Sequence, residues 1–146
     1  MRRLAVVALV QVMVLAACFG GGRGGGVPSG AVDSRQAVDA FMKTVKDKDI
    51  QAMSLIWGTA GGPARDRIAR ADLEKREILM QCYLRHDSYV VKGDSPGQGG
   101  RVIHKVEVVQ GPKKRETSVT TIKGPDDRWF VEDVDISVMQ DFCTGR

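Results

Sequence analysis

The stretch that decides the fold lies in the C-terminal half, where residues 101–136 read RVIHKVEVVQGPKKRETSVTTIKGPDDRWFVEDVDI. Runs rich in Val, Ile and Thr alternate here with turn-forming clusters at Gly111-Pro112 and at residues 124–127. Such runs, joined by short turns, are typical of consecutive antiparallel strands. A similar run precedes them, before a Gly-rich turn at residues 93–100. The four predicted strands span residues 88–92, 101–110, 115–123 and 128–136.

The part of the chain before these strands has the periodicity of helices. Apolar side chains recur at steps of three and four between residues 38 and 45, and Asp33 or Ser34 is placed to cap the first turn. Helices are predicted from residue 33 up to an interruption at 47–49, over residues 50–57, and over residues 65–85.

The third predicted helix is polar at its start and nearly all apolar near its end, from Ile78 to Leu84. We therefore expect its C-terminal half to be buried. Three helices followed by consecutive strands indicate an α+β domain over residues 33–146. In such a domain the helices pack on one face of an antiparallel sheet, here of about four strands.

The N-terminus resembles the signal peptide of bacterial lipoproteins. Two arginines precede an apolar run over residues 4–17, and residues 15–18 read LAAC. The run is shorter than the roughly 20 apolar residues that a membrane-spanning helix needs, so we expect a secretion signal. The LAAC sequence resembles the lipobox, in which the Cys thiol takes a diacylglyceryl group. The resemblance implies a signal peptide over residues 1–17 and lipidation at Cys18.

A lipidated Cys18 would anchor the mature chain at a membrane surface, because two acyl chains suffice for stable binding. In lipoproteins of two-membrane bacteria, an Asp after the Cys retains the protein at the inner membrane. Here that residue is Phe19, so the resemblance implies the outer membrane, facing the periplasm. Two alternatives stay open: ordinary secretion with cleavage nearby, or a buried Cys18 behind an N-terminal helix.

Residues 18–32 contain a run of glycines followed by Pro28 and Ser29. This composition predicts a flexible tether with an r.m.s. reach of about 20 Å. A phosphate-binding loop is disfavoured, because no Lys-Ser or Lys-Thr pair stands directly after the glycines. Without residues 1–17 the chain keeps 20 basic and 18 acidic residues. This near balance, together with export, argues against nucleic acid as a partner.

The order of the predicted elements resembles the nuclear transport factor 2-like superfamily. Four segments carry the resemblance: Ala37–Phe41, Lys46–Asp49, Leu55–Trp57 and Trp129–Val131. It implies a cone-shaped domain with a curved sheet, as in many small secreted bacterial lipoproteins, and a cystatin-like single-helix domain is the nearest alternative. Enzymes of this superfamily place an Asp or His base, and sometimes a phenol, inside the cone. The candidates for such roles in this sequence are Tyr83, Tyr89, His104, Asp133 and Asp135.

Cys82 and Cys143 remain after lipidation of Cys18, an even number in an oxidising compartment. We expect them to form a disulfide that ties the third helix to the C-terminal tail. Closing a loop of this size corresponds to roughly 4 kcal/mol in the chain-entropy estimate. The alternative is a pair of free thiols.

Two further motifs suggest chemistry but have stronger non-catalytic interpretations. Residues 93–97 match Gly-x-Ser-x-Gly, yet Pro96 has no N–H to act as an oxyanion donor. Cys82, His86 and Asp87 resemble a partial metal site, but no second Cys or His pair stands nearby. We therefore expect no catalytic residue, no cofactor and no metal site.

Charged and aromatic residues outside these motifs are expected to lie at the surface and in the core, respectively. The basic residues at 113–115 and between Arg65 and Arg76 suit anionic headgroups, but acidic residues interleave with them, so a solvated surface is expected. Trp57 and Trp129 are expected to anchor the core or line the rim of the cone.

Together these observations predict a membrane-anchored envelope lipoprotein with a non-catalytic binding or scaffolding domain. Its partners would be the membrane, through the lipid anchor, and an envelope protein or a small apolar ligand. A small-molecule or lipid carrier that uses the cone cavity is one alternative. Asp133 and Asp135 alternate on the last predicted strand and so share one face, which keeps a minor isomerase-like or dehydratase-like enzyme as the other.

Overall fold

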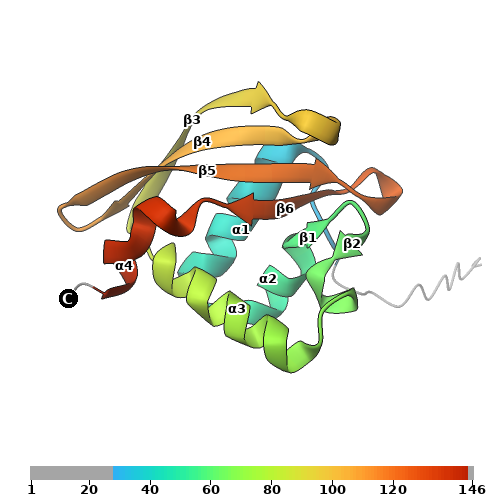
Figure 1. The fold of residues 1–146 in the computed structure, drawn as a ribbon, viewed down its shortest axis with the longest axis horizontal. Helices are drawn as coiled ribbons and strands as arrows, with labels where there is room; N and C mark the ends of the chain where they lie inside the picture. Colours follow the sequence, from blue (N-terminus) through green and yellow to red (C-terminus); the bar gives the residue numbers. More distant parts are fainter. Residues whose placement is uncertain (1–27, 145–146) are drawn as a thin grey trace, which may run out of the picture.

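The computed structural model describes residues 28–144. The predicted signal peptide, Cys18 and most of the predicted tether lie outside the described residues. Within them the α+β prediction is confirmed: helices come first and a four-stranded antiparallel sheet follows (Figure 1). The elements are α1 Ser34–Asp47, α2 Ile50–Ile56, β1 Gly58–Thr59, β2 Gly62–Pro63, α3 Arg70–Tyr83, β3 Ser88–Pro96, β4 Val102–Gln110, β5 Lys113–Lys123, β6 Trp129–Val134 and α4 Gln140–Thr144.

The first two helices begin and end where their capping residues predict. The side chain of Asp33 accepts a hydrogen bond from the Gln36 amide at 2.8 Å, and that of Asp49 accepts one from the Ala52 amide at 2.9 Å. Lys48 ends α1 in the left-handed conformation, with φ at 56°. These caps satisfy backbone groups that a helix end leaves unpaired.

The third helix begins at Arg70 and not at residue 65, which corrects the predicted boundary. Residues 64–66 form a separate 3-10 turn, because the Ala64 amide donates to the Trp57 carbonyl at 2.7 Å and holds this turn against the end of α2. The expected loop before it forms the β1–β2 hairpin. There a Cβ at Gly58 would lie 2.5 Å from the carbonyl oxygen of Gly62, so the hairpin requires glycine at this position.

The sheet has the strand order β3-β4-β5-β6, a simple antiparallel meander. β3 continues to Pro96, whereas the sequence predicted its end at Lys92 and a turn from Gly93 on. A β-bulge between Val91 and Gly93 lets the strand bend and keep pairing with β4. At the other end of the meander, β6 stops at Val134, two residues before the predicted end.

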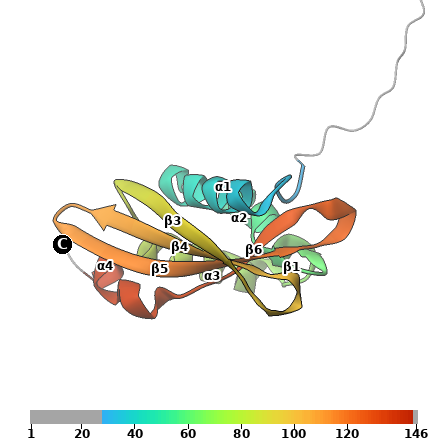
Figure 2. The ribbon, with the colours of Figure 1, turned by 90° about the horizontal axis from the view of Figure 1, so that it is seen from above.

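One face of the sheet packs against α1, while α2 and α3 lie on the β6 side of the molecule (Figures 1 and 2). Alternate residues of β4 and β5 point to the helices and are buried, as period-two alternation predicts. Trp57 and Trp129 are half-buried and pack against the core, as expected. The largest fully buried apolar side chains are Phe41, Phe130, Phe142, Met42, Met53, Leu84 and Met139.

Candidate functional site

Helix α3 buries an acidic side chain among apolar ones and exposes two large apolar side chains to solvent. Ile78 and Leu79 are 58% and 54% exposed, so the expectation that the C-terminal half of α3 is buried is wrong for these residues. The buried residues of α3 are Leu73 and Glu77. Residues 73, 77, 81 and 84 recur at steps of four and three, so they share the face that packs against α1 and α2.

Glu77 is the most unusual residue on this face. Its side chain is 1% exposed, and its Oε1 atom has no hydrogen-bond partner among the described residues. Burial, and secondarily the charge of Glu74, raises its pKa to about 7. A carboxyl group in this state changes protonation near neutral pH, and it can accept a hydrogen bond or bind a cation once ionised.

Glu77 lines a pocket of about 140 Å³ that opens at the surface between α2 and α3. On the α2 side the lining includes Gln51 and Ser54, and at the start of α3 it includes an ion pair in which Arg70 Nε lies 2.7 Å from Glu74 Oε1. A buried acid facing an open pocket offers an acceptor to a small polar ligand. Sequence reasoning did not identify Glu77 as a site residue.

Cys82 and Cys143 lie at bonding distance. Their sulfur atoms are 2.01 Å apart and their Cα atoms 4.9 Å apart, which joins α3 to α4. A bonded Cys82 has no thiolate to offer a metal ion. His86, from the same rejected metal motif, has its Nδ1 atom 2.8 Å from the Leu84 carbonyl oxygen. Across residues 28–144, no three His, Cys, Asp or Glu side chains are grouped to hold a metal ion.

His104 lies in the buried face of β4 between two polar partners. Its Nδ1 atom is 2.7 Å from Asp94 Oδ1 and its Nε2 atom is 3.1 Å from Thr121 Oγ1. This order of groups resembles an acid-base-nucleophile relay. However, His104 and Thr121 are both 0% exposed, so a substrate has no access to either. The arrangement is a satisfied buried polar network, and the Asp94–His104 register of β3 and β4 was missed because residues 93–96 resemble a turn.

Asp133 and Asp135, the two carboxylates of the enzyme alternative, flank the buried Val134 as the expected alternation requires, and they face solvent rather than the interior. β6 ends at Val134, so Asp135 lies just beyond the strand. Asp133 and Asp135 are both exposed. Asp135 caps the following 3-10 turn by accepting hydrogen bonds from Ser137, which lower its pKa.

The two tyrosines also fail to form a catalytic group with them. Tyr89 donates a hydrogen bond to Asp39 of α1 at 2.8 Å, and burial followed by this bond raises its pKa to about 12. Tyr83 is half-buried at the end of α3. The Gly-x-Ser-x-Gly match at residues 93–97 lies in β3 and the turn after it, with Ser95 paired to Ile103.

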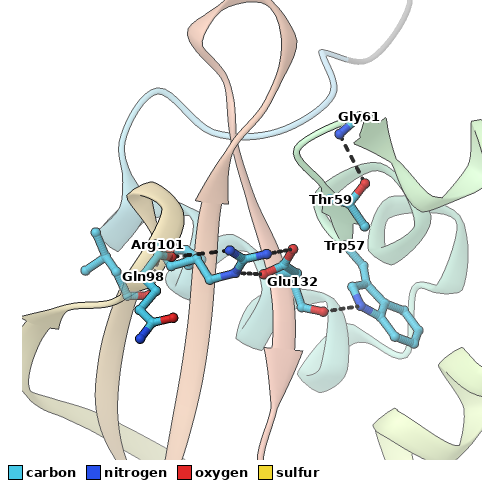
Figure 3. A network of polar contacts seen from close by, with 8 residues as sticks. Trp57, Thr59, Gly61, Gln98, Arg101 and Glu132 are labelled. Carbon is cyan, nitrogen blue, oxygen red and sulfur yellow. Dashed lines mark hydrogen bonds and ion pairs between the residues drawn. The ribbon is translucent and has the colours of Figure 1, made fainter.

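A polar network joins the β3–β4 turn to β6 and to the end of α2 (Figure 3). Arg101 forms a bidentate ion pair with Glu132, with one Nη2–Oε1 distance of 2.9 Å, and Arg101 Nη1 donates to the Gln98 carbonyl at 3.2 Å. The Trp57 indole N–H points to the Glu132 carbonyl oxygen at 3.4 Å. Because each group is paired within the network, its role is to tie the strands together.

Both predicted basic segments contain ion pairs with acidic residues. Lys114 lies 3.2 Å from Glu107, and Arg115 lies 2.7 Å from Asp141. In the 65–76 segment, Arg70 pairs with Glu74, and Lys75 pairs with Asp72 at 3.8 Å. These pairs support the expected solvated surface for the two segments.

Neither the family models nor the curated proteins searched contain a match to the chain. Among the described residues, no helix is both long enough and apolar enough to span a bilayer.

Proposed function

We propose that the protein is a bacterial envelope lipoprotein whose α+β domain binds a small polar ligand without catalysing a reaction. The LAAC sequence supports lipidation at Cys18, and the glycines up to residue 32 support a tether between the anchor and the domain. Phe19 favours the outer membrane, facing the periplasm. The element order supports a cone-shaped domain like that of the nuclear transport factor 2-like superfamily.

The unpartnered carboxyl of Glu77 is the observation that carries the binding function. Burying a polar group without a hydrogen bond costs roughly 1–3 kcal/mol. A ligand with an N–H donor would remove this cost by pairing with Oε1 at the base of the pocket. The pocket volume of about 140 Å³ suits a small amine or amide group.

Other observations disfavour the two alternatives. The enzyme alternative depends on Asp133 and Asp135, which are exposed and lie on different elements. A carrier with an interior cavity needs space between α1 and the sheet, where Phe41, Val106 and Val108 are fully buried in the core. Binding in an open surface pocket fits these residues better.

Lipidation is tested by producing the full chain in a two-membrane bacterium with labelled palmitate. We expect label in the protein and its recovery with the outer membrane. Cys18→Ala should abolish both, whereas Cys82→Ala should keep the label. Labelling that survives Cys18→Ala would overturn the anchor.

Ligand binding is tested with methylammonium, a small cation with N–H donors. Titration above pH 7 should shift the carbon NMR signal of the Glu77 carboxyl, and Glu77→Gln should remove saturable binding. Glu116→Gln is the matched control, because Glu116 is an exposed acid on the sheet. Equal binding by the Glu77 and Glu116 variants would contradict the proposed site.

A further inference from the structure

A second pocket, of about 320 Å³, lies between the end of α1 and the C-terminal half of α3. Its lining includes three basic residues, Lys46, Lys48 and Arg85, and contains no Asp or Glu. The pocket is therefore positively charged at neutral pH. It suits an anionic group such as a phosphate.

The cations of this pocket differ from most others in the described part of the chain. Lys46, Lys48 and Arg85 form no ion pair with a carboxylate of residues 28–144, whereas ten other Lys and Arg side chains in that part do. Lys46 donates to the backbone carbonyl of Asp87 at 3.0 Å, which holds its ammonium group in place. The positive charges are thus left for a partner outside the domain.

A hydrogen-bond donor in the same pocket also lacks an acceptor. The Nε2 atom of Gln81 is buried and has no partner among the described residues. An amide N–H is a neutral donor, and a phosphate oxygen can accept its hydrogen bond. Gln81 and the three cations therefore suit the same kind of ligand group, an oxyanion.

Exposed apolar side chains adjoin this pocket. Ile78 is 58% exposed and forms part of the pocket lining, and Leu79 follows it on α3 at 54% exposed. A membrane surface presents phosphates at the headgroup level and apolar chains just beneath them. Basic residues beside exposed apolar ones are typical of surfaces that bind this interface.

We propose that the face formed by Lys46, Lys48, Ile78, Leu79 and Arg85 docks on an anionic phospholipid membrane. The inference rests on the proposed function only for the location, because the lipid anchor and tether would keep the domain within about 20 Å of such a surface. Phospholipid phosphates bind the cations and Gln81, while Ile78 and Leu79 enter the headgroup region. The anchor holds the protein at the membrane, and this face sets its orientation there.

The test uses the chain from residue 18 with Cys18→Ser, so that acyl chains cannot mask docking. The core of the described residues lies between Ala31 and Phe142, and this variant keeps all of it. We expect this protein to sediment with vesicles that contain phosphatidylglycerol and not with pure phosphatidylcholine vesicles. The binding should weaken with added salt.

Variants with matched controls locate the face. Lys48→Asn, which suits the left-handed backbone of that residue, and Arg85→Gln should each weaken vesicle binding ~5-fold. Lys105→Gln removes the same charge from the outer face of the sheet and should have little effect. Ile78→Ser should weaken binding by a similar factor, with Val90→Ser as its control because Val90 is 53% exposed on the sheet.

Two results would overturn the docking proposal while leaving lipidation intact. One is equal loss of vesicle binding in the control variants, which would indicate non-specific attraction. The other is saturable binding of inorganic phosphate, seen by NMR at Gln81, without binding to either kind of vesicle. That result would make the pocket a site for free phosphate. Palmitate labelling of the full chain tests the anchor independently.

Discussion

The outer face of the sheet and helix α3 use the same residue types in opposite ways. On the sheet, Glu107 lies 3.5 Å from Lys92 and 3.2 Å from Lys114, so charges meet in solvent. On α3 the acid Glu77 is buried without a partner, and the apolar Ile78 is exposed. These charged groups of the sheet are therefore paired with one another and need no outside partner.

The difference shows where this domain has unsatisfied groups. Alternation in a strand sends neighbouring side chains to opposite faces, so charged and apolar residues of the sheet are largely separated, with Val90 as an exposed exception. Helix α3 contacts α1, α2 and α4, and its orientation buries polar atoms of Glu77 and Gln81 and exposes Ile78. We interpret α3 as the functional element and the sheet as its support, and the following experiments test that distinction.

The largest effect is expected from the covalent link that holds α3. Cys82→Ser with Cys143→Ser should lower the free energy of unfolding by about 4 kcal/mol, because the unfolded chain gains the freedom of a long loop. Urea unfolding without reductant measures this loss. Adding reductant to the unmodified protein should produce the same stability, and a reductant-insensitive protein would show that the bond does not form.

The second prediction concerns the pH dependence that Glu77 gives to α3. Its pKa is about 7 in the folded protein against an ordinary value of 4.5, so between these values the folded state holds a proton that the unfolded state has released. Stability therefore falls as pH rises through this window, by about 3 kcal/mol for a shift of this size. Glu77→Gln should flatten the dependence between pH 5 and pH 8 in urea unfolding.

The matched control for this prediction lies on the sheet. Glu116→Gln removes an exposed acid 3.2 Å from Lys105 and should leave the pH dependence unchanged. If both variants flatten the curve equally, the pH dependence comes from overall charge and not from Glu77.

The fold could be predicted from the sequence because its strands have a regular residue pattern. Buried and more exposed residues alternate along the central parts of β4 and β5. Gly and Pro mark the turns that follow these two strands. The extension of β3 was missed because Gly93 and Pro96 resemble turn residues, and only pairing with β4 keeps them in the strand. Local composition does not report such a long-range partner.

The candidate site could be predicted far less well. Residues 78–84 are apolar almost all round the helix, so hydrophobicity alone could not orient α3. The spacing of Leu73, Glu77 and Leu84 held a usable signal, but a Glu in that pattern is ordinarily taken as solvated. Whether Oε1 of Glu77 finds a partner depends on side-chain positions in the fold, which no sequence pattern encodes.

A third, smaller effect is expected in the buried polar network of the sheet. Asp94→Ala leaves Nδ1 of the fully buried His104 without its partner at 2.7 Å. The cost should be about 1–2 kcal/mol, since an unpaired buried donor loses its hydration without compensation. Thermal unfolding measures it, and Ser95→Ala, one residue further along β3, is the control. An unchanged melting temperature would mean that water replaces Asp94.

The smallest effect is expected on the outer face of the sheet, and it separates the two regions most directly. Lys105→Gln breaks an exposed ion pair with Glu116, whose side chains are 62% and 50% exposed. Exposed pairs contribute little because water screens both charges, so the free energy of unfolding should change by less than about 0.5 kcal/mol. Urea unfolding of this variant measures the change beside that of the α3 variants. A loss near 2 kcal/mol would show that a variant of the sheet face changes stability about as much as the α3 variants do. It would remove the reason for assigning function to the helix.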